Sequence, residues 1–354
     1  MIDKYSMSGH KLYWHLDRVN DHLKGKRIAP LYIDMGITQT CNIACKYCYY
    51  AVPENKTRNM IPTDALIRFL KDAAEIGVKA VGFLGDGEPM IHPGVYDAVE
   101  AGAKAGLDMA ISTNGLAMKD GRLKDFLAAL TWIRFNFSAA TPEKYEIVMG
   151  ADRKNYFRAI NNIEKCIKIK KQYDLKVTIG LQMVLINECA DEIVPFAKLG
   201  RNIGVDYAVI KQCSESESVR HNLVVEDYDE LEPLFREAES HSTNGYDVVI
   251  KRRKMQNKVR TYDRCFGCEF LPQITGNGDV YNCGNFFGKE SFLIGNIVEQ
   301  SFKEIVFGEK YLEVMKKVNN EVDVHKECGI NCRQNEINEF LWTLKNPPKH
   351  LNFI

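Results

Sequence analysis

The chain has 354 residues, of which 45% are hydrophobic and 27% are charged, so a disordered or fibrous protein is excluded. The 47 basic and 47 acidic side chains balance, which argues against a protein that coats nucleic acid or an anionic membrane. No apolar run reaches the ~18 residues that a membrane helix needs, and residues 1–15 lack a signal-peptide pattern. We therefore expect a cytoplasmic protein with reduced thiols and no membrane or nucleic-acid partner.

Eleven cysteines in a reducing compartment need a role other than disulfide formation, and metal binding or catalysis is the first candidate. Three of them lie close together near the N-terminus, five lie in the last quarter of the chain, and the other three are isolated. This distribution predicts two metal sites, one in each of two domains. The clustered cysteines are Cys41, Cys45 and Cys48, followed by Cys265, Cys268, Cys283, Cys328 and Cys332.

Residues 31–254 alternate short β-like runs with amphipathic helical runs. Strands are predicted over 31–37, 80–84, 108–112, 132–138, 177–185 and 205–212, and helices over 63–74, 95–105, 121–129, 156–171 and 192–199. Such alternation is typical of right-handed βα units and a parallel sheet. Six units are fewer than the eight of a closed barrel. The sequence therefore predicts an α/β fold with a partial (β/α)6 TIM-type barrel.

The sequence pattern changes near residue 258, where cysteines, glycines and short predicted strands replace the βα pattern. We expect an N-terminal extension over 1–29, the barrel over 30–257 and a small cysteine-rich domain over 258–354. Before the boundary, a helix is predicted over 226–239 and an extra strand over 247–251. In the last domain, Asn277 and Gly278 between apolar residues predict a β-hairpin, and a helix is expected over 302–318.

The first cysteine group directly follows the first predicted strand, with the spacing Cys41-x3-Cys45-x2-Cys48. In a barrel of this kind the chemistry gathers at the C-terminal ends of the strands. Three thiolates can hold three corners of a four-iron cluster and leave one iron open, which is typical of a catalytic site. With the aromatic Tyr47 before the last cysteine, the loop resembles the cluster-binding motif of the radical S-adenosylmethionine (SAM) superfamily.

Further strand ends extend this resemblance over about residues 30–215. Residues 85–89 (Gly-Asp-Gly-Glu-Pro) are similar to the GGEP segment of the superfamily, with Asp86 in place of its first glycine. Residues 112–115 are similar to its TNG segment. The resemblance implies that Glu88 helps to hold the amino group of SAM. The full set of SAM-binding residues that it implies is Tyr47, Gly87, Glu88, Pro89, Ser112, Asn114, Ser138 and Gln182.

The resemblance also implies a mechanism. A 4Fe–4S cluster on Cys41, Cys45 and Cys48 would chelate SAM through its open iron. An electron from an external donor such as flavodoxin or ferredoxin would then cleave SAM, and the resulting 5′-deoxyadenosyl radical would take a hydrogen atom from the substrate.

The C-terminal cysteines resemble the SPASM/twitch extension of the same superfamily, which binds auxiliary iron–sulfur clusters. The pattern Cys268-x9-Gly278-x4-Cys283 is close to its opening motif. Five cysteines suffice for one auxiliary 4Fe–4S cluster and one spare residue. A structural zinc ribbon is the alternative, because two short cysteine pairs also suit zinc. The preferred ligands are Cys268, Cys283, Cys328 and Cys332, while Cys265 is either the spare or replaces one of them.

Cys213 ends the sixth predicted strand, where a barrel faces its substrate. Its thiol could return a hydrogen atom to a substrate radical, as in epimerase-type members of the superfamily, or it could be an ordinary buried cysteine. Lys211 and the basic run 251–254 could neutralise a phosphate or carboxylate, although a short basic run is more often a solvated face.

These observations predict an enzyme, a radical SAM oxidoreductase or epimerase that acts on a small metabolite such as a sugar or nucleotide sugar. A peptide or protein maturase is the first alternative. It is disfavoured because only ~30 residues precede the first strand, fewer than a leader-binding domain needs. A non-catalytic iron–sulfur or zinc module is the second alternative, and the intact Cys41, Cys45, Cys48 and Glu88 speak against it.

Overall fold

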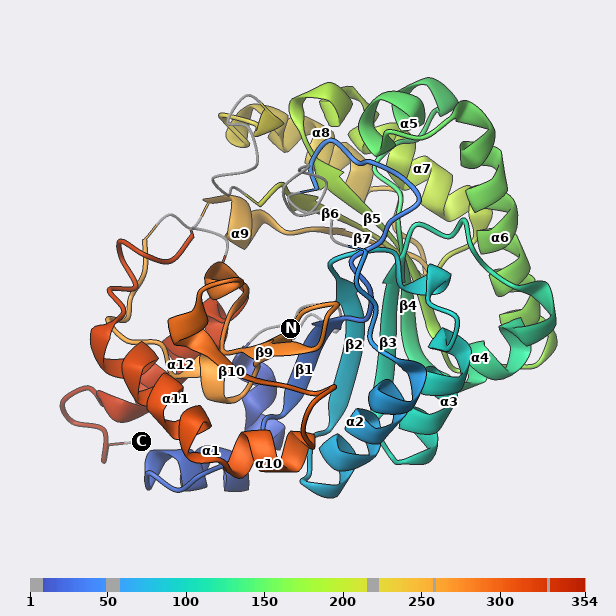
Figure 1. Ribbon diagram of the computed structural model, residues 1–354. Coiled ribbons are helices and arrows are strands. Elements are labelled where there is room, and N and C mark those ends of the chain that lie inside the picture. The colour runs from blue at the N-terminus through green and yellow to red at the C-terminus, as the bar shows by residue number, and fades with distance from the viewer. Residues whose placement is uncertain (1–8, 49–57, 215–222, 257–258, 330–331, 354) are drawn as a thin grey trace.

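The structure of the protein is a computed structural model that describes residues 9–48, 58–214, 223–256, 259–329 and 332–353. Ten strands form one continuous curved sheet in the order β10-β9-β8-β1-β2-β3-β4-β5-β6-β7 (Figure 1). Strands β1 to β7 pair in parallel, which confirms the predicted partial barrel. Their bounds are β1 (Tyr32–Gly36), β2 (Ala80–Gly85), β3 (Asp108–Thr113), β4 (Leu130–Asn136), β5 (Thr178–Leu185), β6 (Tyr207–Gln212) and β7 (Asp247–Ile250).

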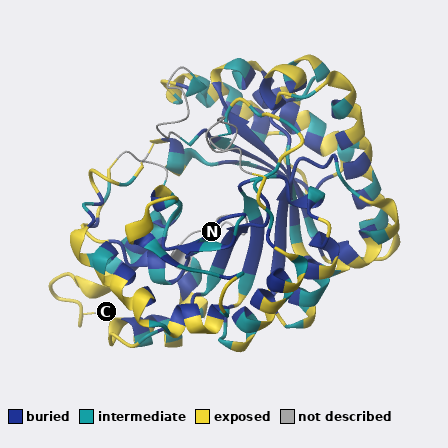
Figure 2. Cartoon of the chain, viewed as in Figure 1, coloured by how far each residue is buried: buried dark blue, intermediate teal, exposed yellow. Residues whose placement is uncertain are grey.

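Helices cover the outer side of this sheet, and the inner side is left to the site (Figure 1). Each helix buries one apolar stripe against the strands and exposes its polar side to solvent, as Figure 2 shows. Between consecutive strands lie α2 (Thr63–Glu75), α3 (Val95–Lys104), α4 (Leu123–Ala129), α6 (Arg153–Gln172), α7 (Ile193–Ile203) and α8 (Glu232–Glu239).

Among the described residues up to 256, three helices were not predicted from the sequence. They are α1 (Leu16–Leu23), α5 (Pro142–Met149) and α9 (Arg252–Gln256). Helix α5 begins at Thr141, whose side chain accepts a hydrogen bond from the Lys144 backbone, and ends at Gly150, which has a left-handed backbone with φ of 58°. It matters to function because its C-terminal end supports the first cysteine loop.

The cysteine-rich region extends the barrel sheet. Strand β8 (Gln273–Ile274) pairs in parallel with β1 and forms the predicted hairpin with β9 (Asp279–Tyr281), and β10 (Leu293–Asn296) completes the edge. The helix expected over 302–318 is divided at Gly308 into α10 (Phe302–Phe307) and α11 (Glu309–Glu321), because Gly308 adopts an extended backbone. Helix α12 (Asn335–Lys345) follows the last cysteine and was not predicted.

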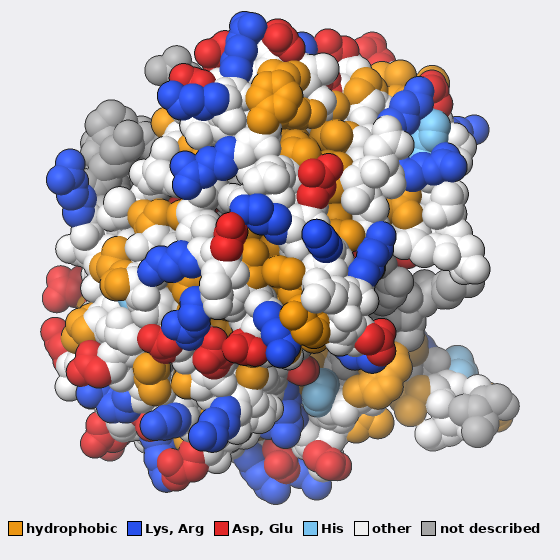
Figure 3. Space-filling model, turned by 90° about the vertical axis from the view of Figure 1, so that its right-hand side faces the viewer, with side chains coloured by type: hydrophobic (Ala, Val, Ile, Leu, Met, Phe, Trp, Pro, Cys, Tyr) orange, Lys and Arg blue, Asp and Glu red, His pale blue; other side chains and the backbone are white. Residues whose placement is uncertain are grey.

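The outer surface carries both signs of charge. On the face that Figure 3 shows, which is the right-hand side of Figure 1 with α4 and α6, basic and acidic side chains alternate over the helices. Such mixing agrees with the balanced composition and leaves no single-sign field on that face. Within the described part of the chain, no helix is both long and apolar enough to cross a bilayer.

Candidate active site

A cavity of about 670 Å³ lies at the C-terminal ends of the barrel strands. The first cysteine loop and the 85–88 loop form one wall, and the inward-facing residues of β3 to β7 form another. Helix α9 and residues Arg333 and Glu336 of the C-terminal region close the third side. The site is therefore built by both parts of the chain.

Cys41, Cys45 and Cys48 all line this cavity, as the spacing predicts. Their loop is fixed at several points. The Lys46 backbone N–H donates to the Val148 carbonyl at 3.0 Å, and Cys48 N–H donates to Cys45 O at 3.1 Å. These bonds leave the three sulfurs facing one space while the backbone between them is held.

Gly150, at the end of α5, packs closely against the backbone of this loop. A Cβ atom at Gly150 would lie 2.1 Å from the carbonyl oxygen of Ala44, so only glycine permits the end of α5 to approach the loop this closely. The Asn42 side chain also accepts a 2.7 Å hydrogen bond from the Asn114 amide, which connects the loop to the end of β3.

Two of the three thiols, Cys41 and Cys45, lie in an environment that favours their protonated form. Burial, helped by the neighbouring Glu88 and Cys48, raises the pKa of Cys41 to about 11. Burial and the two other thiols raise the pKa of Cys45 further above its ordinary range. Three thiolates can coexist here only beside a compensating cationic group, and iron supplies that charge. The donor set therefore fits a four-iron cluster with one open position.

The 85–88 loop presses against the start of the cysteine loop. A Cβ at Gly87 would lie 2.2 Å from the Thr40 carbonyl, and the next N–H, of Glu88, donates to that carbonyl at 2.9 Å. Glycine is thus required at the position that the resemblance singled out.

Glu88 lines the cavity, but its carboxylate is already used inside the protein. It accepts from Met90 N–H at 3.0 Å, from Asn114 N–H at 2.7 Å and from the Thr113 hydroxyl. Burial raises its pKa to about 7 in spite of these bonds. The carboxylate therefore positions the 85–88 loop against the end of β3, and a direct contact with the amino group of SAM stays a prediction.

Asp86 departs from the GGEP pattern in an informative way. Its φ of 66° is left-handed, a conformation that glycine adopts more easily. Its Oδ2 accepts a hydrogen bond from the Gly276 N–H in the β8–β9 turn. Asp86 therefore connects the 85–88 loop of the barrel to the C-terminal hairpin.

A row of polar side chains crosses the inner wall. The Asn136 Oδ1 on β4 accepts from the Ser112 hydroxyl at 3.1 Å and from the Gln182 amide at 2.9 Å. Ser112, Asn114 and Gln182 line the cavity, and their contact with SAM stays a prediction. Asn136 was missed, because an Asn within a strand gives no signal of its own in the sequence.

Two predicted SAM-contacting residues lie behind the wall instead. The Ser138 hydroxyl donates to the Tyr47 hydroxyl at 3.0 Å and accepts from Val184 N–H at 2.9 Å, and the residue is 0% exposed. Pro89 is buried at the start of a short 3-10 helix (Pro89–Ile91). Neither is among the residues that line the cavity, whereas Tyr47 is. Ser138 therefore positions Tyr47, and the contacts of Ser138 and Pro89 with SAM stay predictions.

Cys213 does not face the cavity. Strand β6 ends at Gln212, so the alternation that turns Lys211 inward stops before residue 213. Cys213 is 1% exposed and packs in the hydrophobic core. This placement gives no support to a hydrogen-donating thiol at the substrate, and that role stays a prediction. Cys166 and Cys189 are also buried in the core.

None of the five C-terminal cysteines lines the cavity. The charge of Cys265 influences the pKa of each of the other four thiols. Burial raises the pKa of Cys283, and burial raises that of Cys328 to about 12, so this set too needs a compensating metal group. Cys265 thus lies within electrostatic reach of the other four thiols, and which four of the five hold the cluster stays a prediction.

Helix α12 supplies polar support to Cys265 from the opposite side. The Asn338 amide donates to the Cys265 sulfur at 3.4 Å, and its Oδ1 accepts from the backbone N–H groups of Phe266 and Gly267 at 2.8 and 2.6 Å. The Cys265 thiol donates to the Gln334 Oε1 at 3.2 Å. Both supporting side chains are buried, at 1% and 2% exposure. Polar residues in this helix gave no sequence signal because polar side chains are usually solvent-facing.

No three histidine, cysteine or acidic side chains of the described residues are grouped so that they could hold one metal ion. The fit to iron–sulfur clusters rests instead on the thiol sets described above. Asn282, next to Cys283, adds to it: its buried side-chain amide has no hydrogen-bond partner in the described chain, so its polar atoms are available to a sulfur-rich group.

Comparison with known proteins agrees with these two sites. Residues 35–199 match the radical SAM superfamily, and residues 265–333 match SPASM, an iron–sulfur cluster-binding domain. The cofactor-modifying protein of the tungsten-containing aldehyde ferredoxin oxidoreductase of Pyrococcus furiosus is 25% identical over 79% of this chain and 82% of its own. The AdoMet-dependent heme synthase of Methanosarcina barkeri is 23% identical over 85% and 88%, respectively.

Solved structures share the fold at lower sequence identity. Streptococcus suis SuiB bound to S-adenosylmethionine has a TM-score of 0.65 at 17% identity, covering 85% of this chain and 71% of that chain. Native anSMEcpe with bound AdoMet has a TM-score of 0.61 at 19% identity, covering 88% of both chains.

Proposed function

Because the chain belongs to the radical SAM superfamily and carries a SPASM domain, we propose that it removes a hydrogen atom from a small molecule bound in the 670 Å³ cavity. The cavity carries the proposal, because one space is bordered by the three cysteines on one side and by polar residues of the barrel on the other. Its volume falls within the ~300–1,000 Å³ of small-molecule sites.

As a radical SAM enzyme with a SPASM domain, the protein binds a four-iron cluster, SAM and auxiliary iron–sulfur. We assign Cys41, Cys45 and Cys48 to the SAM-binding cluster. The auxiliary site is assigned as one four-iron cluster, with Cys265 and Cys283 among its ligands.

When bound, the reduced cluster and SAM supply a 5′-deoxyadenosyl radical, which abstracts hydrogen. The residues of this chain bind and orient the two reactants. Tyr47 and Val184 offer apolar surface beside the cysteine loop, and Asn114 joins that loop to β3. The row of Ser112, Asn136 and Gln182 offers hydrogen bonds to a polar ligand. Closure of the third side by the C-terminal region limits the access of water.

The sequence relatives favour a small molecule over a peptide. The two that match over most of both chains are named for modifying a cofactor and for making heme. A GTP 3′,8-cyclase of Campylobacter fetus is 32% identical over 47% of this chain and 52% of its own. The peptide in the SuiB complex with its precursor SuiA belongs to a protein with which this chain shares the fold alone. None of these names points to a sugar, so the sugar part of the expectation has no support.

Among redox outcomes, oxidation of the substrate fits better than epimerisation. Epimerisation needs a hydrogen donor at the substrate, and the thiol that the sequence suggested for this task, Cys213, lies in the core. We therefore propose net oxidation, with an external one-electron donor of the flavodoxin or ferredoxin type needed to reduce the SAM-binding cluster.

The test is anaerobic reconstitution, followed by iron and sulfide counts and by measurement of 5′-deoxyadenosine released from SAM under reduction. Wild type should hold about eight irons and cleave SAM. Cys45→Ala should lose about four irons and all cleavage, while Cys166→Ala, which removes a core thiol, should retain both. Failure of the fully loaded wild type to cleave SAM would contradict the proposal and favour a non-catalytic module.

The metal count also decides the role of the C-terminal site. About four irons and one zinc in wild type would make that site a structural ribbon. Binding of a leader peptide to the loaded enzyme, with no response to small molecules, would instead favour peptide maturation.

A further inference from the structure

We propose that Arg134, Lys211 and Lys254 form a subsite that binds a doubly charged anionic group of the substrate, either a phosphate or a pair of carboxylates. The inference rests on the proposed function, because it assigns a part of the same cavity. It adds the chemical class of the substrate.

The three cations come from separate elements and meet at one cavity. Arg134 lies on β4, Lys211 on β6 and Lys254 on α9, and all three line the cavity together with Arg333 from the C-terminal region. Lys211 is within electrostatic reach of Arg134, Arg333 and Lys254. Four positive side chains that line one cavity are unusual in a chain with zero net charge and mixed charges on the face in Figure 3.

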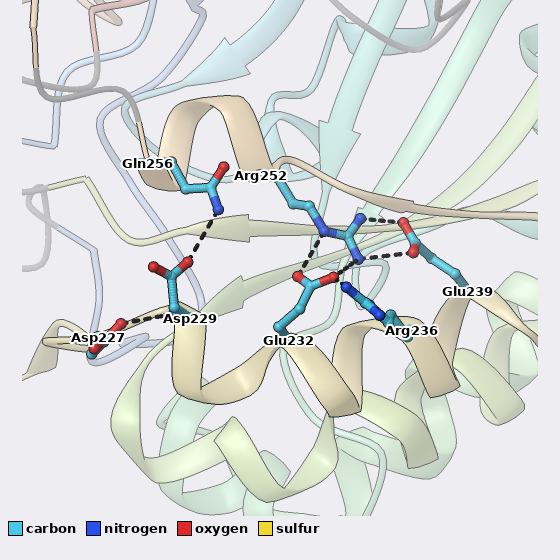
Figure 4. A network of polar contacts seen from close by, with 7 residues as sticks. All are labelled: Asp227, Asp229, Glu232, Arg236, Glu239, Arg252 and Gln256. Atoms are coloured by element: carbon cyan, nitrogen blue, oxygen red, sulfur yellow. Dashed lines mark hydrogen bonds and ion pairs between the residues drawn. The ribbon is translucent and has the colours of Figure 1, made fainter.

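Nearby carboxylates neutralise other cations. Figure 4 shows Arg252 held by two glutamates of α8, with Nε to Glu232 at 2.9 Å and Nη2 to Glu239 at 2.8 Å. Arg253 pairs with Glu339 and, at 3.8 Å, with Glu336. The basic run of residues 251–254 therefore combines two ion-paired arginines with lysines that line the cavity.

The subsite has far less negative charge. Asp34 pairs with Arg333 and accepts from Gln273 at 3.0 Å. Among the described residues, no carboxylate lies within ion-pair distance of Arg134, Lys211 or Lys254, although Glu336 attracts Lys254 from farther away. The Arg134 Nε is buried without a hydrogen-bond partner in that part of the chain, and its Nη2 makes one long contact, 3.5 Å, to Ser112.

This arrangement disfavours positive charge when the cavity lacks an anion. Burial, followed by repulsion from Arg134, Arg333 and Lys254, lowers the pKa of Lys211 to about 7. Burial and Arg333 also lower the pKa of Lys254, against the attraction of Glu336 and Cys332. The groups that face Lys211 are thus cationic, apart from the thiol of Cys213. A dianion would relieve this repulsion and supply acceptors for Arg134 and the lysines.

Two other roles for these cations make different predictions. Arg134 and Lys211 could bind the carboxylate of SAM, or Lys254 could offset the charge of the auxiliary cluster near Cys332. The first role requires SAM affinity to fall when the cations are removed. The second requires iron to be lost.

The experiment measures binding of inorganic pyrophosphate and of malonate to the reconstituted enzyme with SAM present, by calorimetry. Arg134→Gln and Lys211→Gln are compared with Lys168→Gln, which removes an exposed cation on α6. We expect each cavity variant to weaken the preferred anion roughly tenfold or more, with SAM affinity and iron content unchanged. Lys168→Gln should change the affinity by less than about twofold. Stronger binding of pyrophosphate indicates a phosphate ester, and stronger binding of malonate indicates paired carboxylates.

Several results would overturn the subsite. The first is that neither anion binds wild type at millimolar concentration. The second is that both anions bind the cavity variants as well as they bind wild type. The third is that SAM affinity or iron content falls in parallel with anion binding. If a variant does not fold, chemical modification of the wild-type protein tests the subsite instead. Amine acetylation at pH 7.5 should modify Lys211, and pyrophosphate or malonate should protect Lys211 and leave Lys168 as reactive as before. Equal modification of Lys211 with and without both anions would contradict the proposal.

Failure of the subsite and failure of the proposed function give different results. If wild type cleaves SAM but binds no anion, only the proposal of the anion subsite is contradicted. If wild type binds anions through Lys211 and never cleaves SAM, the proposed function is contradicted and the anion subsite is supported.

Discussion

The two cysteine groups differ in what surrounds their sulfur atoms. Cys41, Cys45 and Cys48 line a cavity, and each is at least partly exposed. Cys265 and Cys268 are buried, and none of the five C-terminal cysteines reaches that cavity. The first group can therefore admit a ligand at its metal from this cavity, whereas the second group does not border the cavity, although Cys283, Cys328 and Cys332 are only half-buried.

The supporting residues differ in the same direction. The first loop is held mainly through its backbone, by the end of α5 and by the 85–88 loop, with one side-chain bond from Asn114 to Asn42. In the second group, the buried amide of Asn338 donates directly to the Cys265 sulfur. Hydrogen bonds to the sulfurs and exclusion of solvent tune a cluster for stability and electron transfer. The comparison teaches that one residue type supports an open and a closed metal site in the same chain.

The largest effect is expected from removing a ligand of the first cysteine group, the open site. Cys45→Ala should abolish SAM cleavage and leave the about four irons of the auxiliary site in place, because the two groups share no ligand. The measurement is 5′-deoxyadenosine release together with an iron count. Loss of all iron would show that the two sites do not assemble independently.

The second effect concerns the closed site. Cys265→Ala should remove most of the auxiliary iron, about four atoms per chain, because Cys265 lies among the other four thiols. Cys213→Ala is the matched control and should keep all iron. Full iron in Cys265→Ala would restore Cys268, Cys283, Cys328 and Cys332 as the complete ligand set.

Removal of the donor to Cys265 should sharpen the comparison further. Asn338→Leu deletes one N–H···S bond and leaves the N–H groups of Phe266 and Gly267 without their acceptor. A loss of about 2–4 kcal/mol in unfolding free energy is expected, with a shift in the reduction potential of the auxiliary cluster. Chemical denaturation and a redox titration measure the two effects, and an unchanged potential would show that the residue has only a structural role.

Asp86 connects the two regions, and its variants test that connection. Asp86→Ala loses the hydrogen bond from Gly276 and places Ala at a left-handed backbone position that Ala disfavours. The free energy of unfolding should therefore fall by about 1–3 kcal/mol. Asp86→Asn retains an acceptor and tolerates positive φ, so it should cost less than 1 kcal/mol or so. Thermal unfolding decides, and equal Tm values for the two variants would contradict this role.

The smallest effect is a pH dependence at the wall between the two regions. Lys211 has a folded-state pKa lowered to about 7 from 10.5, so the unfolded chain holds a proton that the folded chain lacks between those values. Stability should therefore rise with pH across that window. Lys211→Met should remove this rise and stabilise the anion-free protein at pH 7 by about 1–2 kcal/mol. A parallel pH dependence of Tm in wild type and Lys211→Met would contradict it.

The parts of the fold that follow local periodicity were predictable. The parallel strands, the outer helices and the hairpin at Asn277–Gly278 are set by burial patterns and turn residues within a few positions. The cysteine loop was predictable because its spacing is itself the signal.

The parts that depend on distant contacts were not predictable. Period-two alternation suggests that Cys213 faces the same side as Lys211, but the strand stops between them. Nothing local to Arg333 shows that it reaches Asp34 on β1, some 300 positions away in sequence. Asn338 looks like an exposed polar residue until α12 packs against the Cys265 turn. Ser138 ends its strand as predicted, yet its hydroxyl donates to Tyr47.

The most direct test of the account is electron paramagnetic resonance of the reduced protein with and without SAM. Wild type and Cys265→Ala should both show a SAM-induced change in one cluster signal, and Cys45→Ala should show a cluster signal that SAM does not alter. A SAM-induced change in Cys45→Ala, or its loss in Cys265→Ala, would contradict the assignment of the open site to the first cysteine group.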